Sequence, residues 1–168
     1  MNIFTIGYEG TNINNVLDIL LDYEIDTLLD VRLTPISRKS GFSKSSLSEY
    51  LSDNGISYLH VKSLGCPNSI RTPYKENGNW SLYSRRYKEY LQTHLDDVLD
   101  ITGLALTLNC CLLCFERDAN FCHRSFVADK MVEISDGSLK RFDLRPSLTS
   151  STARIVKTDP LFPGLVCP

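Results

Sequence analysis

The sequence predicts a single-domain Rossmann-like α/β protein: a three-layer sandwich with a mostly parallel sheet and helices on both faces. Short apolar β runs alternate along the chain with segments whose apolar residues repeat at helical spacing, and repeated strand–helix units build parallel sheets with right-handed crossovers. The run at 110–115 is apolar without interruption, which is typical of a central strand covered on both faces.

The chain begins with a strand–turn–helix unit. Residues 2–6 form a short apolar run that leads into a turn at Gly7. The next segment has one apolar face at helical spacing, formed by Ile13, Val16, Leu17, Leu20 and Leu21. We therefore expect a strand followed by an amphipathic helix.

The remaining elements follow from the same two patterns. Strands are expected at 25–31, 56–61, 110–115 and 139–144, and helices at 45–53, 84–99 and 123–134. The segment 101–108 fits either a continuation of a helix or the start of a strand. Two connections, 33–43 and the longer 62–81, are rich in residues that break helices and strands and are expected to be loops. We expect one α/β domain over 1–145 and a Ser-, Thr- and Pro-rich tail over 146–168.

Composition restricts the class of protein. Hydrophobic residues make up 42% of the 168 residues and charged residues 23%, so the chain can bury an ordinary core. The net charge of −2 argues against a bulk nucleic-acid-binding surface, although a local pocket for one phosphate or nucleotide remains compatible with it. No membrane helix or signal peptide is recognisable, so we expect a cytoplasmic protein without membrane partners. A homo-oligomer stays open, and no cofactor is assigned.

Residues capable of chemistry follow each predicted strand. In parallel sheets, ligands bind beyond the carboxyl ends of the strands, so side chains far apart in the sequence should share one edge. The residues expected at this edge are Gly7, Tyr8, Asp30, Arg32, His60, Cys114 and Glu116. Asp30 and Arg32 have two interpretations: a base with an arginine fork for phosphate, or a structural ion pair.

The segment Cys122-His123-Arg124-Ser125 opens the last predicted helix. A helix N-terminus has free N–H groups and a partial positive charge, so this segment predicts an anion pocket. The alternative is an ordinary N-terminal region in which Arg124 pairs with Glu116. Together with the strand ends, the segment completes a set of expected catalytic residues, Asp30, Cys114, Glu116, Cys122 and His123, and of expected substrate- or phosphate-binding residues, Gly7, Tyr8, Arg32, Arg38, His60, Arg124 and Ser125.

The cysteines also suggest a metal site, which we do not include among the expected sites. Cys111 and Cys114 have an odd separation in a predicted strand, so they should point to opposite faces of the sheet. Zinc bound by Cys114, Cys122 and His123 is kept as an alternative.

Taken together, these motifs resemble the family catalogued as domain of unknown function 488. The resemblance runs over about residues 2–144 and implies that the shared motifs form the functional site. It rests on Thr5-Ile6-Gly7-Tyr8, Leu29-Asp30-Val31-Arg32, Pro35, Ser37-Arg38, Tyr58-Leu59-His60, Leu64-Gly65, Tyr87, Leu113-Cys114-Phe115-Glu116 and Cys122-His123-Arg124.

A second, weaker similarity is to rhodanese-like sulfurtransferases, through Asp30-Val31-Arg32 and a cysteine between a strand and a helix. Asn120 stands where a Cys-x5-Arg loop would have its arginine, which argues against direct sulfur or phosphate transfer. The leading hypothesis is an enzyme that acts on a nucleotide or nucleic-acid-like substrate, and the expected partner is a small-molecule or nucleotide-type substrate. The alternatives are cysteine-dependent sulfur transfer or redox chemistry, and a non-catalytic binding or adaptor domain.

Overall fold

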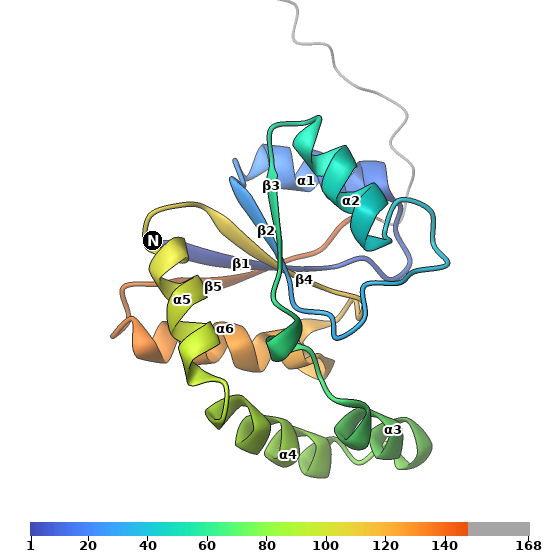
Figure 1. Cartoon of the computed structure of the whole chain (residues 1–168), viewed down its shortest axis with the longest axis vertical. Coiled ribbons are helices and arrows are strands. Elements are labelled where there is room, and N and C mark those ends of the chain that lie inside the picture. Colours follow the sequence, from blue (N-terminus) through green and yellow to red (C-terminus); the bar gives the residue numbers. More distant parts are fainter. Residues whose placement is uncertain (148–168) are drawn as a thin grey trace, which may run out of the picture.

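A five-stranded sheet, parallel throughout, runs through the centre of the molecule in the order β3-β2-β4-β1-β5 (Figure 1). The computed structural model describes residues 1–147. The strands are β1 (Asn2–Gly7), β2 (Thr27–Asp30), β3 (Ser57–His60), β4 (Cys110–Cys114) and β5 (Lys140–Leu144). The α/β class expected from the sequence is confirmed. All but the first two residues of the predicted tail lie outside the described residues.

Helices cover both faces of the sheet. They are α1 (Ile13–Asp22), α2 (Lys44–Ser52), α3 (Asn68–Asn77), α4 (Trp80–Gln92), α5 (Leu95–Ala105) and α6 (His123–Ile134), with short 3₁₀ turns η1 (Lys62–Leu64) and η2 (Ala119–Phe121). Helices α1 and α2 lie on one face, and α5 and α6 lie on the other (Figure 1). Two apolar cores result, one on each side of the sheet.

The central strand β4 supplies both cores because successive side chains of a strand point to opposite faces. Cys110 and Leu112 pack in the core beneath α4, α5 and α6, whereas Cys111 and Leu113 pack in the core beneath α1 and α2. All five residues of β4 are buried. The continuous apolar run is therefore explained by burial on both sides.

The expectation of a long loop over 62–81 is wrong. This segment holds η1 and the whole of α3, which contains Pro73 and ends at Gly78, whose φ of 66° is left-handed. Helix α3 buries none of its residues fully, and only Ile70 and Tyr74 pack against the core from it, so its apolar pattern is too short to detect in the sequence. Its Tyr74 packs against Trp80 and Tyr83 of α4 at ring-centroid distances of 5.5 and 4.8 Å.

The single helix expected over 84–99 is also wrong, because the chain forms two helices there. Helix α4 starts earlier, capped by the Asn79 side chain, and ends at Gln92. Helix α5 starts at Leu95 after a break at Thr93 and His94. The apolar spacing continues across this break, so periodicity alone could not reveal it. Within the described residues, no helix has both the length and the apolar character needed to cross a membrane.

Candidate functional site

Four side chains converge at the carboxyl end of β4. The thiols of Cys114 and Cys122 each donate a hydrogen bond to the same oxygen of Glu116, Oε2, at 2.9 and 3.1 Å. The Nδ1 atom of His123 lies 3.8 Å from the Cys114 sulfur and 3.9 Å from the Cys122 sulfur. We call Cys114, Glu116, Cys122 and His123 the thiol cluster.

Three members of the thiol cluster lie at the ends of elements, and Glu116 lies in the loop that follows β4. Cys114 is the last residue of β4, and Cys122 and His123 are the N-cap and first residue of α6. The Cys122 side chain does not cap the helix and points to Glu116 instead. His123 Nε2 lies 2.8 Å from the carbonyl oxygen of Val31. Since a carbonyl can only accept, Nε2 carries a proton, and in the neutral ring Nδ1 keeps its lone pair beside the two sulfurs.

The pKa values of the two cluster thiols shift in opposite directions because of burial and of their contact with each other. Burial raises the pKa of Cys114 well above its ordinary value, and the neighbouring Cys122 and Glu116 raise it further. Burial opposes ionisation of Cys122 as well, but hydrogen bonding to Cys114 and the charge of His123 outweigh it and lower the pKa of Cys122 well below its ordinary value. Burial, followed by the charge of Cys122, raises the pKa of Glu116. Of the two thiols, Cys122 is therefore the one that gives up its proton more readily.

Arg124 has no exposed surface and fixes the loop that carries Glu116. Its guanidinium donates to the hydroxyl of Thr5 and to the carbonyl oxygens of Glu116 and Arg117. These three contacts are internal to the protein, so we assign Arg124 a positioning role instead of contact with a phosphate. Ser125 is likewise directed inward, since its hydroxyl donates to the carbonyl oxygen of Cys122 at 2.8 Å.

Arg32 and Asp30 form a buried ion pair, exposed by 6% and 0%. The Arg32 guanidinium also donates to the Tyr8 hydroxyl and to the Phe42 carbonyl oxygen, at 2.9 and 2.8 Å. Asp30 accepts a further hydrogen bond from Tyr58 at 2.6 Å. This geometry matches the structural interpretation of the pair. His60 is the last residue of β3 and is paired in register with Asp30. Its Nε2 atom donates to the Arg32 carbonyl oxygen at 2.9 Å.

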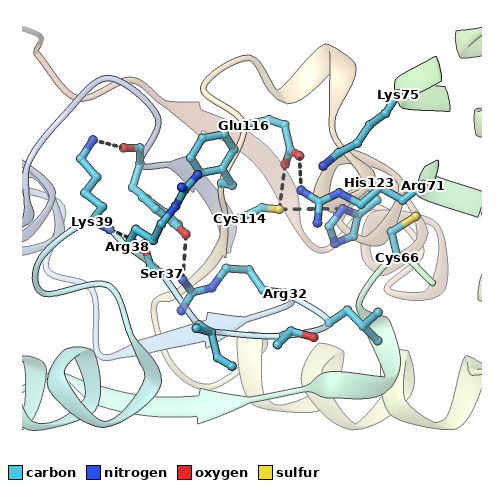
Figure 2. Close-up of a pocket in the computed structure, with 15 residues that line it drawn as sticks. Arg32, Ser37, Arg38, Lys39, Cys66, Arg71, Lys75, Cys114, Glu116 and His123 are labelled. Atoms are coloured by element: carbon cyan, nitrogen blue, oxygen red, sulfur yellow. Dashed lines mark hydrogen bonds and ion pairs between the residues drawn. The ribbon is translucent and has the colours of Figure 1, made fainter. Parts of the chain in front are cut away.

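A cavity of about 450 Å³ opens beside the thiol cluster. Figure 2 shows Arg38 and Lys39 on one side of Cys114 and Glu116, and Arg71 and Lys75 on the other. Among the described lining residues Glu116 is the only acid, whereas the basic residues are Arg32, Arg38, Lys39, Arg71 and Lys75. The lining also includes Tyr8, Ile36, Cys66, Phe115, Cys114 and His123.

The cavity brings together only part of the predicted set. Among the predicted residues, its lining includes Tyr8, Arg32, Arg38, Cys114, Glu116 and His123 and does not include Gly7, Asp30, His60, Cys122, Arg124 or Ser125. Sequence reasoning missed Lys39, Arg71 and Lys75. Arg71 and Lys75 stand four residues apart in α3 and so share a helix face, but the helix itself was not predicted.

The thiol cluster also contains the donor atoms of a metal site. One atom each from Cys114, Glu116, Cys122 and His123 lie within 4.8 Å of one another. Cys111 is excluded as the sequence predicted, because it packs in the core on the other face of the sheet. The zinc alternative raised by the sequence thus gains Glu116 as a fourth donor.

The fold and site define a parallel α/β protein with a buried thiol–carboxylate–imidazole cluster beside a basic cavity. The family model described as domain of unknown function DUF488 matches residues 12–131. The chain belongs to this family, as the motif resemblance predicted. Neither the curated proteins nor the solved structures gave a significant match.

Proposed function

We propose that this protein is an enzyme that binds a nucleotide-type anion in the cavity and acts on it at the thiol cluster. One observation carries the proposal: basic side chains are concentrated around the cavity, although the whole chain has a net charge of −2. A cleft lined by one sign of charge concentrates ligands of the opposite sign. A volume of about 450 Å³ is within the ordinary range for small-molecule sites.

The phosphate end of such a ligand would lie between Arg38 and Lys75. Both side chains are exposed, line the cavity and, among the described residues, form no ion pair with an acidic group. Lys39 donates to the uncharged Tyr8 carbonyl oxygen at 3.0 Å, and within residues 1–147 no carboxylate pairs with its positive charge. Arg38 offers the planar fork that suits phosphate oxygens.

The base end would lie against the apolar part of the lining. Phe115 is 40% exposed and Ile36 is 81% exposed, and both line the cavity. Phe115 is held edge-on by Tyr8 at a ring-centroid distance of 5.3 Å. An exposed, braced aromatic ring provides a stacking surface for a base.

The reacting group would lie against Cys114, Glu116 and His123, which form the cavity wall between the two basic sides (Figure 2). Glu116 is the only acid among the described lining residues. Both thiols donate to its Oε2 atom, so the other oxygen, Oε1, is placed to exchange a proton with a bound substrate. The Arg71 guanidinium lies 3.7 Å from Glu116 Oε1 and would link the anion site to this carboxylate.

Ligand-dependent melting tests the proposal. Adenosine monophosphate and pyrophosphate at millimolar concentration should raise the melting temperature of the wild-type protein, because a ligand that binds only the folded state stabilises it. Arg38→Ala and Lys75→Ala should lose most of this increase. Arg86→Ala is the matched control, because Arg86 is exposed on α4 and is absent from the cavity lining. No increase in the wild type, or the same increase in all three variants, would overturn the proposal.

A further inference from the structure

We propose that Cys114, Glu116, Cys122 and His123 bind one divalent metal ion, and that the ligand chemistry selects zinc. Two thiolates, one imidazole and one carboxylate are among the usual protein ligands of Zn²⁺. The inference concerns the thiol cluster alone and does not depend on the substrate proposed for the cavity.

The donor atoms all lie within 4.8 Å of one another, so a small inward movement would bring them around a tetrahedral ion. With metal–sulfur bonds of about 2.3 Å and metal–nitrogen bonds of about 2.0 Å, neighbouring donor atoms lie roughly 3.3–3.8 Å apart. The two sulfur–Nδ1 distances of 3.8 and 3.9 Å are close to this range. The sulfur–carboxylate distances of 2.9 and 3.1 Å are shorter because a thiol proton lies in each hydrogen bond. A metal ion would replace both protons.

The histidine already has the orientation of a metal ligand. Its Nε2 proton is held by the Val31 carbonyl oxygen at 2.8 Å, so Nδ1 is the ring nitrogen that faces the two sulfurs. A backbone carbonyl that fixes the tautomer in this way is the usual outer contact of a metal-binding histidine. The ring is also braced edge-on by Tyr87 at a centroid distance of 5.2 Å.

The surroundings suit the charge of the bound ion. Zn²⁺ with two thiolates and one carboxylate has a net charge of −1, and the two thiol protons are released on binding. Arg71 lies 3.7 Å from the outer oxygen of Glu116 and would compensate this charge. Arg124 holds the backbone of the same loop, so the ligands are positioned before the metal arrives.

The other described cysteines provide the contrast. Cys110 and Cys111 are fully buried in the two apolar cores. Cys66 lines the same cavity but is outside the group of donor atoms, and burial raises its pKa to about 11. Cys66 is therefore the matched control for the cluster cysteines.

Metal analysis of reduced, purified protein after incubation with Zn²⁺ and removal of the unbound ion tests the site. The wild type and Cys66→Ser should each retain about one equivalent, since a ligand set of this kind binds zinc tightly. Cys122→Ser and His123→Ala should each retain less than a tenth of that amount. Circular dichroism and thermal melting of each variant show whether it is folded.

Cobalt substitution keeps the test decisive if a variant fails to fold. Co²⁺ added to the reduced wild-type protein should give thiolate-to-cobalt absorption and the visible spectrum of a tetrahedral site, and a stoichiometric amount of Zn²⁺ should abolish both. Folded, reduced wild type that retains no zinc and gives no thiolate-to-cobalt absorption would overturn the proposal. Full zinc retention by a folded Cys122→Ser protein would overturn it as well.

Discussion

Gly7 lies directly against the backbone of Glu116: a β carbon at position 7 would come within 1.9 Å of the Glu116 carbonyl oxygen. Gly7 is also paired in register with Cys114 across β1 and β4. The strand end and the loop after β4 therefore pack backbone to backbone, which brings Glu116 over the thiol of Cys114. The proximity of carboxylate and thiol depends on the absence of a side chain at position 7.

Gly7→Ala should unfold or strongly destabilise the protein, because the atom that the new methyl group meets is backbone and cannot rotate away. A loss of about 3 kcal/mol or more in the free energy of unfolding is expected from such overpacking, measured by urea denaturation. Gly103→Ala is the control: a β carbon there meets nothing within 4 Å, and the helical position favours alanine by roughly 1 kcal/mol. Equal stability of the two variants would contradict the packing described for Gly7.

Arg124, in α6, holds the loop that carries Glu116. The Asp143 carboxylate accepts a hydrogen bond from Thr5 at 2.8 Å, and the Thr5 hydroxyl in turn accepts one from Arg124 Nε at 3.2 Å. Arg124→Met should therefore leave one buried and two part-buried oxygens without their donor and lower the free energy of unfolding by about 3 kcal/mol. Arg86→Met, on the exposed surface of α4, should change it by less than roughly 0.5 kcal/mol. If Arg124→Met lowered the free energy of unfolding no more than Arg86→Met, the hydrogen bonds from Arg124 would not be needed to hold the loop.

The Asp143 carboxylate, which accepts the hydrogen bond from Thr5, predicts a pH dependence of the free energy of unfolding. Partial burial opposes ionisation of Asp143, but hydrogen bonds from Arg141 and Thr5 outweigh it and lower its pKa below 3.8. A carboxylate whose pKa is lowered by folding adds stability above the unfolded pKa, and this contribution is lost as the pH falls through the folded value. Asp143→Asn should thus be less stable than the wild type at pH 6, with the difference shrinking toward pH 3. A difference independent of pH in urea titrations would argue against this role.

Arg32 and Asp30 should behave as a structural pair. Both are buried, and the Asp30 carboxylate also accepts from Tyr58. Arg32→Met removes one partner and leaves a buried carboxylate without its cation, which costs about 3–5 kcal/mol. The measurement is equilibrium unfolding in urea, with Arg38→Met as the control, because Arg38 is exposed. Similar stabilities for the two variants would contradict the structural assignment.

The sequence was sufficient to predict the sheet and the thiol cluster because both follow from regular patterns. Apolar runs locate the five strands of the sheet, and parallel order places their carboxyl ends together. Cys114 and Glu116 follow one such run, and Cys122 and His123 open the next helix. The four side chains come together once the loop between β4 and α6 brings the start of α6 to the end of β4.

The basic side of the cavity could not be predicted in the same way. Arg71 and Lys75 lie on α3, a helix without a fully buried residue and with a proline inside it. Its position depends on contacts of Tyr74 with two aromatic residues of α4, which are tertiary contacts. The sequence also could not show that Arg124 would point inward to backbone carbonyls, since an arginine at a helix start suits an anion pocket equally well.

Isothermal titration calorimetry with adenosine monophosphate and adenosine tests the central claim most directly, because the two ligands differ only in the phosphate. The side chains around the cavity, Arg38, Lys39, Arg71 and Lys75, should favour the phosphate by roughly 1.5–3 kcal/mol, the contribution of hydrogen bonds to charged groups. This corresponds to at least about tenfold tighter binding of the monophosphate, and added salt should reduce the difference. Equal affinities for the two ligands, or no binding of either, would contradict the account.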